Sequence, residues 1–424
     1  MGTKLAGRSR RYPQVAVSRI VYFSLPACGH VNPTLPVVAE LVRRGVEVHY
    51  FATEQFQWAV EAAGAVFVPY TVEFRMPARG QGPFRFADTT VETLLEMSEA
   101  VLRAHLLQVR AMAPTIVMHD SFSPWGGLVA RCLRLPTVAS VPSIAVNQEI
   151  ATRYGPGPDA APPEPGLTPE WLVRVKARCA AFSERYGLPP PRSPAELLQT
   201  YGDLNVVYTS RWFQPLEGSF PSDRFKFVGA CLQARPDAAP FPFERLDGRP
   251  LVYVSMGSVY EDLAHVFRTC LEALAEGHWQ VVMATGWNFP EGWPAPLPDN
   301  FLVQPFVPQL EILRRAAVFV THAGMNGTHE ALYNGVPLVA LPQGSDQFWI
   351  AHRAAELGVG LVLEGGAVTA RCLRESVERI LDDPAYAAAA ARVGESLRVA
   401  GGPARAAGEI AAFLTTAGRE SVPA

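Results

Sequence analysis

The sequence predicts an α/β protein made of two facing Rossmann-like domains with a cleft between them. Strand and helix patterns alternate through both halves of the chain, and a stretch rich in proline and charge separates the two series. The 424 residues are enough for two such domains to bury a core each. We place the first domain at 1–232, a linker at 233–250, the second domain at 251–400, and a terminal helix and tail at 401–424.

Five segments of the first half are apolar or alternating runs rich in β-branched residues, which is typical of strands. They lie at 19–26, 46–53, 65–70, 115–120 and 135–142. Apolar residues at helical spacing predict helices at 33–45 and 54–64, and each ends at a glycine that can close a helix. The segments 71–98 and 147–200 break the alternation, and we expect irregular binding loops or lids there.

Six further strands are predicted after the linker, and amphipathic helices separate most of them. They lie at 251–258, 280–286, 301–306, 317–322, 337–342 and 360–365. The segment 385–416, rich in alanine and arginine, has the pattern of two helices. Both halves therefore have the order of a doubly wound parallel sheet, in which ligands bind beyond the carboxyl ends of the strands.

The composition excludes several classes of function. Hydrophobic residues make up 49% of the chain and charged residues 18%, which excludes wholesale disorder. A formal net charge of -3 gives no basic surface, so we expect no nucleic-acid partner. No apolar run approaches the roughly 18 residues of a spanning helix, so we expect no membrane partner. The six cysteines lack any C-x-x-C spacing, and we expect reduced thiols in a cytoplasmic protein of undetermined oligomeric state.

The sharpest candidate site is the segment THAGMNGTHEAL, at 321–332. It follows a predicted strand and opens a helix, so its backbone N–H groups and positive helix end suit a diphosphate. His322 and Thr328 would add hydrogen bonds to phosphate oxygens, and the carboxylate of Glu330 suits ribose hydroxyls. Taken alone, the segment is equally well explained as a structural helix start.

Its neighbours strengthen the assignment. FVPQLEIL (306–313) stands upstream and VPLVALPQGSDQ (336–347) downstream. The whole run resembles the donor-site signature of family 1 nucleotide-sugar glycosyltransferases, in their bacterial macrolide and natural-product (MGT-like) group. SMGS (255–258) is similar to the phosphate-contacting loop of that family. The resemblance covers nearly the whole chain and implies the GT-B architecture of two facing Rossmann-like domains.

The resemblance implies a role for each matching residue of the donor site. Gln309 would hydrogen-bond the base and Phe306 would flank it, while Glu330 would bind the ribose. The diphosphate would be held by His322, Thr328 and Ser258, in the turn and helix start that also contain Gly324, Asn326 and Gly327. Asp346 and Gln347 would bind hydroxyls of the transferred sugar. Two residues depart from the family pattern: Phe306 replaces the usual Trp, and Ile350 replaces an Asn found in many members.

His30 is the candidate base. It lies in the loop SLPACGHVNPTL (24–35), where a dinucleotide-binding protein would have a G-x-G-x-x-G set. A neutral imidazole can take a proton from an acceptor hydroxyl, and it works best when a carboxylate holds its other nitrogen. Asp120 ends the strand 115–120 at the same edge of the sheet, and it matches the aspartate that pairs with the catalytic histidine in the family. We expect the adjacent His119 to be structural.

These residues together imply an inverting glycosyltransferase that moves a sugar, expected to be glucose, from a UDP-sugar to a hydroxyl. The acceptor class implied is a hydrophobic, hydroxylated natural product such as a macrolide, polyketide or flavonoid. The candidate acceptor residues are Phe74, Met76, Phe84, Trp125 and Ser143, although the aromatic ones are equally well explained as core. No D-x-D motif ends a strand and no H-E-x-x-H exists, so we expect no metal.

Three alternatives stay open. The first is a transferase that uses a dTDP-deoxysugar in antibiotic biosynthesis, although Glu330 favours a ribose with both hydroxyls. The second is a nucleotide-sugar epimerase, which would need acid and base groups around the sugar ring. The third is a non-catalytic partner subunit, which should have lost the base or the diphosphate residues that this chain retains.

Overall fold

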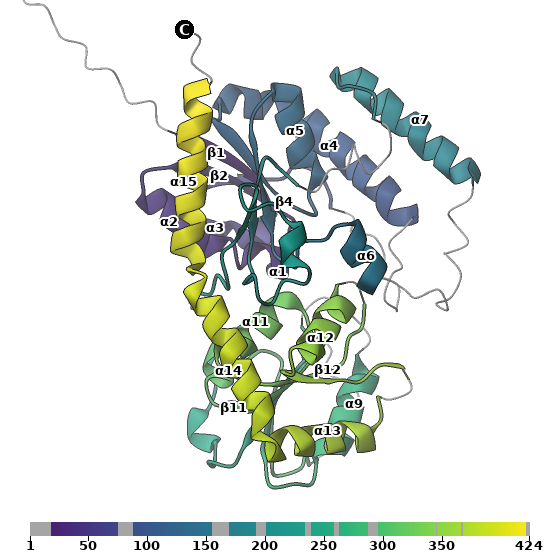
Figure 1. Ribbon diagram of the computed structural model, residues 1–424, viewed down its shortest axis with the longest axis vertical. Coiled ribbons are helices and arrows are strands. Elements are labelled where there is room, and N and C mark those ends of the chain that lie inside the picture. Colours follow the sequence, from purple (N-terminus) through teal and green to yellow (C-terminus); the bar gives the residue numbers. More distant parts are fainter. Residues whose placement is uncertain are drawn as a thin grey trace, which may run out of the picture.

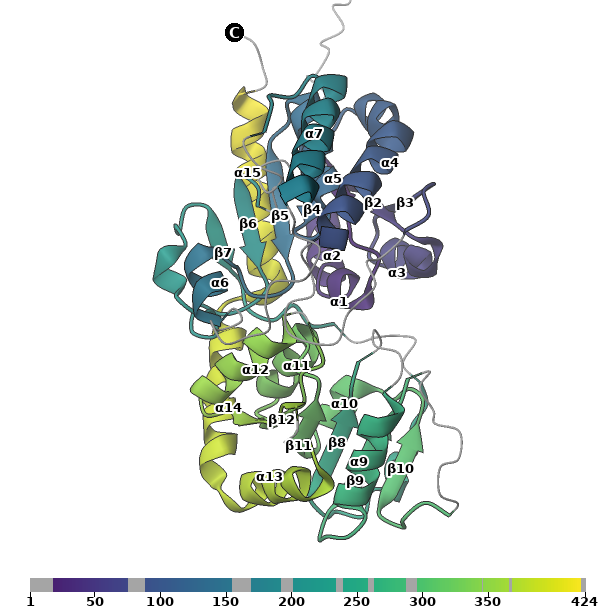
Figure 2. The ribbon, with the colours of Figure 1, turned by 90° about the vertical axis from the view of Figure 1, so that its right-hand side faces the viewer.

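The computed structural model describes residues 18–74, 88–154, 169–191, 201–233, 239–257, 263–286, 296–344, 346–365 and 368–420. Their strands form two sheets that follow one another along the long axis of the molecule (Figures 1 and 2). Every pairing among the described strands is parallel. The predicted fold class is therefore confirmed. The candidate residues Met76, Phe84 and Ser258 lie outside the described residues.

The first sheet has the strand order β3-β2-β1-β4-β5-β6-β7. Its strands are β1 (Arg19–Phe23), β2 (Glu47–Ala52), β3 (Val66–Pro69), β4 (Ile116–Asp120), β5 (Thr137–Val141), β6 (Leu204–Val207) and β7 (Phe225–Phe227). The first five confirm the predicted strands. The last two, of four and three residues, were not predicted.

Helices cover both faces of this sheet. They are α1 (Cys28–Val31), α2 (Leu35–Arg43), η1 (Glu54–Phe56), α3 (Gln57–Ala62), α4 (Asp88–Met112), α5 (Pro124–Leu133), α6 (Gln148–Tyr154), α7 (Pro169–Tyr186) and η2 (Glu217–Ser219). Three of them correct the expectation of irregular loops, since α4 begins within 71–98, and α6 and α7 lie within 147–200. In α7 an apolar face that includes Trp171, Val175 and Phe182 is buried against the same core as α4. The flanking prolines and glycines obscured this period in the sequence.

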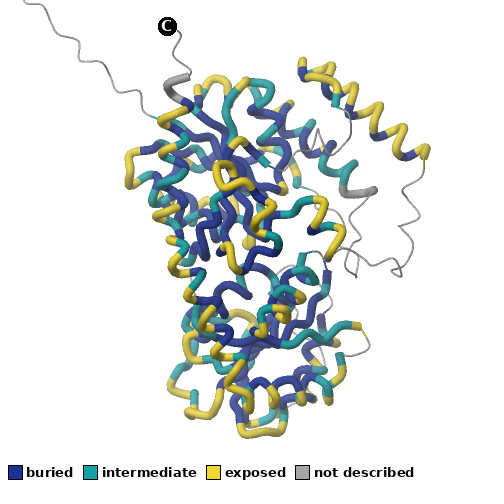
Figure 3. The backbone as a smooth tube through the Cα atoms, in the orientation of Figure 1, coloured by how far each residue is buried: buried dark blue, intermediate teal, exposed yellow. Residues whose placement is uncertain are grey.

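The second sheet has the order β10-β9-β8-β11-β12-β13. Its strands are β8 (Leu251–Ser255), β9 (Gln280–Ala284), β10 (Phe301–Gln304), β11 (Ala316–Thr321), β12 (Leu338–Ala340) and β13 (Gly360–Val362), which confirm the six predictions. The helical elements of this half are η3 (Phe243–Arg245), α9 (Ala264–Leu274), α10 (Gln309–Leu313), α11 (Met325–Tyr333), α12 (Gln347–Glu356), α13 (Ala370–Asp382), α14 (Pro384–Val399) and α15 (Gly402–Glu420). The strands of both sheets consist mostly of buried residues (Figure 3).

The C-terminal helix α15 returns to the first half and lies beside its sheet (Figures 1 and 2). Ala407, Ile410 and Leu414 are buried in the same apolar cluster as Ile20 of β1. A separate apolar cluster joins residues of both halves, including Phe213 before the linker and Met325 after it. The two halves are therefore packed together as well as connected by the chain.

The strand order reverses at one point in each sheet, and these points position the candidate site. In a doubly wound sheet the crevice lies where neighbouring strands send their connections to opposite faces. In the first sheet this point lies between β1 and β4, and in the second between β8 and β11. The candidate base, its carboxylate and the proposed diphosphate turn lie at or just beyond the carboxyl ends of these strands.

Candidate active site

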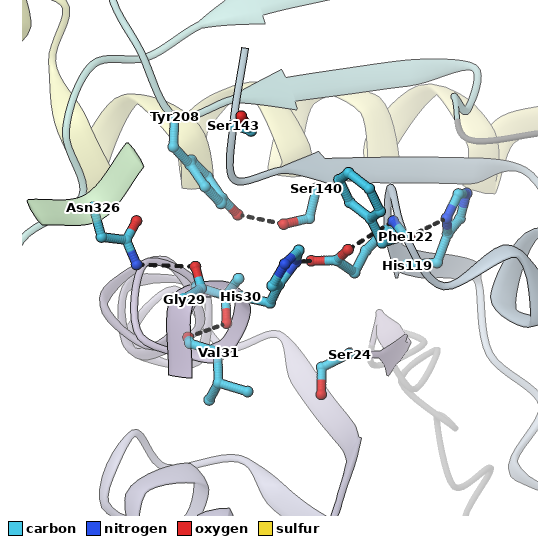
Figure 4. Close-up of polar contacts among 12 residues, drawn as sticks. Ser24, Gly29, His30, Val31, His119, Phe122, Ser140, Ser143, Tyr208 and Asn326 are labelled. Atoms are coloured by element: carbon cyan, nitrogen blue, oxygen red, sulfur yellow. Dashed lines mark hydrogen bonds and ion pairs between the residues drawn. The ribbon is translucent and has the colours of Figure 1, made fainter. Parts of the chain in front are cut away.

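His30 and Asp120 form a hydrogen-bonded pair at the switch point of the first sheet (Figure 4). His30 lies in α1, soon after β1, and Asp120 is the last residue of β4. The distance from His30 Nδ1 to Asp120 Oδ2 is 2.9 Å. The Asp120 side chain is completely buried, whereas 20% of the His30 side chain is exposed. Because an ionised carboxylate can only accept, Nδ1 holds the proton and the Nε2 lone pair is the basic position of the ring.

Phe122 completes this pair, and the sequence did not single it out. Its backbone N–H donates to Asp120 Oδ1 at 2.7 Å, so both carboxylate oxygens are held. Its ring meets the imidazole of His30 edge-on, with 5.4 Å between the centroids, and is 40% exposed. An aspartate that ends a strand commonly accepts from the N–H two residues on, and that turn pattern was the available signal.

The other titratable side chains around Asp120 are buried. His119 is 1% exposed, its Nδ1 lies 3.0 Å from the carbonyl oxygen of Asp120, and burial lowers its pKa. Burial also raises the pKa of Tyr22 and Tyr208 well above the usual value for a phenol. Among these groups, His30 is thus the one with an exposed ring that can reach a ligand.

His322 follows β11, and its imidazole lies between two glycines. A Cβ added to Gly257 would lie 2.6 Å from Cε1 of the ring, and one added to Gly324 would lie 2.4 Å from Nε2. Real Cβ atoms do not approach this closely, so an alanine at either position would force the His322 ring to move. Ala323, between His322 and Gly324 in the sequence, has φ 61°, a left-handed conformation that costs about 1–2 kcal/mol in a residue with a Cβ. Such strain is typical of turns whose geometry serves a site.

Gln309, Glu330 and Tyr253 are joined by hydrogen bonds beside β8 and β11. The Tyr253 hydroxyl donates to Gln309 Oε1 at 2.9 Å, and Gln309 Nε2 donates to Glu330 Oε2. The residues predicted to bind base and ribose are therefore adjacent. Tyr253 was missed because it stands inside an apolar strand, where an aromatic residue is ordinary core. Its ring stacks on Phe319, with 4.8 Å between the centroids.

Several other residues predicted to bind the nucleotide sugar have hydrogen-bond partners within the chain. Asp346 Oδ2 accepts from Ser143 Oγ at 2.6 Å. This bond joins a residue predicted to bind the transferred sugar to one predicted to bind the acceptor molecule, across the two halves. Gln347 Oε1 accepts from the N–H of Gln343 at 2.8 Å, so this side chain caps its own loop. Asn326 Nδ2 donates to the carbonyl of Gly29 at 2.9 Å.

The structure also shows the surroundings of Thr328, Gly327 and the two residues that depart from the family pattern. Thr328 is completely buried, and its hydroxyl has no hydrogen-bond partner among the described residues. A Cβ on Gly327 would lie 3.4 Å from the Phe319 ring. Phe306 is 41% exposed, as a stacking platform needs to be. Ile350, which stands where many family members have Asn, is completely buried in the core, so its side chain is not placed to contact a sugar.

The candidate acceptor residues Phe74 and Trp125 lie together, with 5.5 Å between their ring centroids. Trp125 is only 1% exposed, and its Nε1 donates to the Tyr70 hydroxyl at 3.1 Å. It is therefore a core residue beneath Phe74 and has no face open to a ligand in this conformation. Phe74 is half-buried and Ser143 is buried.

Metal-binding clusters and membrane-spanning helices are both absent from the residues that the structure describes. Within the described ranges, no group of three or more His, Cys, Asp and Glu side chains is arranged to hold a metal ion. None of the helices in the part of the chain that the structure describes is both long and apolar enough to cross a membrane.

Two parallel sheets with a histidine–aspartate pair at one switch point and a histidine turn at the other fit a glycosyltransferase of GT-B fold. Known structures agree. The kitacinnamycin glycosyltransferase superposes with a TM-score of 0.80 at 28% identity, covering 93% of this chain and 98% of the other. The calicheamicin glycosyltransferase CalG4 gives 0.77 at 28%, covering 94% of this chain and 99% of the other.

Sequence relatives extend the comparison to the whole chain. Residues 269–413 match the family model described as "Erythromycin biosynthesis protein CIII-like, C-terminal domain". The demethyllactenocin mycarosyltransferase of Streptomyces fradiae is 34% identical, over 98% of this chain and 91% of the relative. The "Uncharacterized UDP-glucosyltransferase YojK" of Bacillus subtilis (strain 168) is 31% identical, over 93% of this chain and 97% of the relative. The chain belongs to the family 1 nucleotide-sugar glycosyltransferases, in their macrolide and natural-product group.

Proposed function

We propose that this glycosyltransferase moves glucose from UDP-glucose to a hydroxyl of a large apolar natural product, such as a macrolide, polyketide or flavonoid. The proposal rests chiefly on the His30–Asp120 pair at 2.9 Å, with its carboxylate buried and its imidazole reachable. Such a pair can hold one tautomer and stabilise the imidazolium that forms when a hydroxyl gives up its proton. An epimerase or a non-catalytic subunit gives no reason for this arrangement opposite a donor turn.

The reaction we propose inverts the anomeric carbon. His30 Nε2 takes the proton of the acceptor hydroxyl as the acceptor oxygen attacks C1 of the sugar. The bond between C1 and the diphosphate oxygen breaks, and UDP leaves from the opposite face. The transition state has oxocarbenium character, as in glycoside hydrolysis. His322 and the N-terminus of α11 would stabilise the charge that grows on the diphosphate, so we propose that no divalent metal is needed.

On the donor side, Phe306 and Gln309 would hold the base and Glu330 the ribose. Thr328, whose buried hydroxyl has no partner among the described residues, would donate to a diphosphate oxygen once the donor is seated. Asp346 and Gln347 would meet the sugar hydroxyls. The remaining members proposed for the diphosphate turn are Ser258, Gly324, Asn326 and Gly327. On the acceptor side, the exposed ring of Phe122 and the half-buried Phe74 are the described aromatics that we expect an apolar acceptor to contact.

A second candidate differs only in the donor. The Streptomyces relative is named a mycarosyltransferase and the Bacillus relative a UDP-glucosyltransferase, and this chain is similarly close to both. A dTDP-deoxysugar would lack the ribose 2′-hydroxyl. We favour UDP-glucose because Glu330 lies beside Gln309, where a carboxylate can accept from both ribose hydroxyls.

The test is a transfer assay with chelator present. UDP-glucose, UDP-galactose, UDP-GlcNAc and a dTDP-deoxysugar are each combined with polyphenol and macrolide acceptors, and products are identified by mass and anomeric configuration. We expect a product heavier by one hexose, of inverted configuration, from UDP-glucose. His30→Ala should lower turnover by roughly 10²–10⁴-fold. Preferential use of the dTDP-sugar would favour the second candidate, and turnover by His30→Ala within about threefold of wild type would refute the base assignment.

A further inference from the structure

The one-turn helix α1, which holds His30, lacks one of its own hydrogen bonds. In an α-helix the carbonyl of residue i accepts from the N–H of residue i+4. The N–H of Asn32 donates to the carbonyl of Cys28 at 3.0 Å. The next pair would join Gly29 to Pro33, but proline has no N–H to donate. The carbonyl directly before His30 therefore has no donor within α1.

A donor comes from the other half of the molecule. Asn326, in the first turn of α11, donates from Nδ2 to the Gly29 carbonyl at 2.9 Å (Figure 4). A Cβ on Gly29 would lie 3.9 Å from the same nitrogen, so the two segments are in contact there. The helix that begins at the proposed diphosphate turn thus touches the residue next to the candidate base.

Within the first half, α1 is held at two other points. The Thr34 hydroxyl donates to the Val31 carbonyl at 2.7 Å and lies 2.8 Å from the Tyr50 hydroxyl. Asp120 holds the imidazole itself. These contacts fix the end of α1 and the His30 ring, whereas the backbone at Gly29 is fixed from across the two halves.

We propose that Asn326 is a positioning residue for His30, because its amide supplies from the donor half the hydrogen bond that Pro33 cannot give to Gly29. The inference rests on the proposed function of His30. It gives Asn326 a second role beside the contact with the nucleotide sugar proposed above. The position of the His30 side chain then depends on the contact between α11 and α1. An amide nitrogen has two hydrogens, so this bond leaves Asn326 one more to offer a donor phosphate.

The experiment is a double-mutant cycle between Asn326→Ala and Pro33→Ala. Loss of one hydrogen bond is worth about 0.5–1.5 kcal/mol, so Asn326→Ala should lower kcat roughly 2–12-fold with little change in KM for UDP-glucose. Pro33→Ala restores an N–H at the i+4 position. In the Asn326→Ala background it should therefore recover much of the lost kcat, although it cannot replace a phosphate contact.

Ser396→Ala is the matched control. It removes another hydrogen bond between the halves, which joins the Ser210 and Ser396 hydroxyl oxygens at 2.8 Å, at a point away from α1. We expect its kcat to stay within about twofold of wild type. An Asn326→Ala variant with a raised KM, unchanged kcat and no recovery by Pro33→Ala would overturn the proposal, as would an equal loss of kcat in the control.

Hydrogen exchange of the backbone amides at 30–32 and 34 separates this inference from the proposed function. It is measured on the protein without substrate. Asn326→Ala should speed exchange of the α1 amides severalfold, and Pro33→Ala should slow it again. Unchanged exchange would refute the positioning role even if transfer activity is confirmed. Faster exchange in a chain that transfers no sugar would leave the cross-half contact established and refute the proposed reaction instead.

Discussion

The two switch points use their polar side chains differently. At the first, His30 and Asp120 are bonded to each other and the imidazole stays partly exposed. At the second, some of the candidate ligand groups are bonded to protein partners, as Glu330 is to Gln309 and Asp346 is to Ser143. A proton-transfer pair works through its internal bond. A binding group must instead exchange its protein partner for the ligand, so its net contribution is a difference between two hydrogen bonds.

The largest effect is expected from breaking the pair at the first switch point. Asp120→Asn keeps the shape of the side chain but removes the charge that stabilises the imidazolium, and the amide can impose the wrong tautomer. We expect kcat to fall roughly 10²–10⁴-fold, measured by steady-state transfer. Asp223→Asn, at an exposed position before β7, should leave kcat unchanged. Activity of Asp120→Asn near that of wild type would contradict the role of the pair.

The second switch point should be most sensitive at the glycines around His322. Gly324→Ala places a methyl group where the imidazole lies, and overpacking of this kind costs about 1–3 kcal/mol. Because the ring must move, we expect UDP to bind roughly 5–150-fold more weakly by calorimetry, with a smaller effect on kcat. Gly218→Ala is the matched control, since no atom lies within 4 Å of its added Cβ. Equal affinities in both variants would show that the His322 ring is not a donor contact.

A third prediction concerns stability at the contact between the halves. His329 on α11 is buried, its Nε2 lies 3.2 Å from Thr209 Oγ1, and burial lowers its pKa to about 3. The unfolded chain binds a proton below its ordinary pKa of about 6.5, while the folded chain does not. Stability should therefore fall as the pH drops below about 6.5, by roughly 2 kcal/mol at pH 5 from this residue alone.

His329→Asn removes the titrating group and should flatten that dependence. The measurement is urea denaturation of both proteins at pH 7 and pH 5, with the loss between the two pH values compared. Because the variant changes a buried residue, its absolute stability can differ, but the difference in pH dependence is the quantity that tests the prediction. An identical loss in both proteins would mean that His329 takes up its proton without unfolding.

The smallest effect is expected at the donor network. Tyr253→Phe keeps the stacking on Phe319 and removes the hydroxyl that donates to Gln309. We expect UDP affinity to fall about 2–12-fold, the value of one hydrogen bond of about 0.5–1.5 kcal/mol that orients the neighbouring amide. Binding unchanged within error would show that the Gln309 amide is held well enough by Glu330.

Much of this could be predicted from local pattern. The eleven strands expected from hydrophobic runs are present, because each needs only the burial pattern of its own few residues. The pairing of His30 with Asp120 could be predicted from the sequence, because the carboxyl ends of parallel strands meet at one edge of a sheet. The helix α7 was missed for the converse reason, since the prolines and glycines around it outweighed its apolar face.

The sequence by itself determined the order of strands and helices, the strand-end positions of His30, Asp120 and His322, and the glycines that flank the last of these. Only the tertiary structure decided which groups are accessible to a ligand and which are buried or already hydrogen-bonded within the protein. It buries Trp125 and Ile350, assigns the Gln347 oxygen to its own loop, and brings Asn326 to Gly29 across the two halves. The physical reason is range. Strand and turn preferences act over a few neighbouring residues, whereas burial and hydrogen-bond partners depend on segments nearly 300 residues apart in the chain.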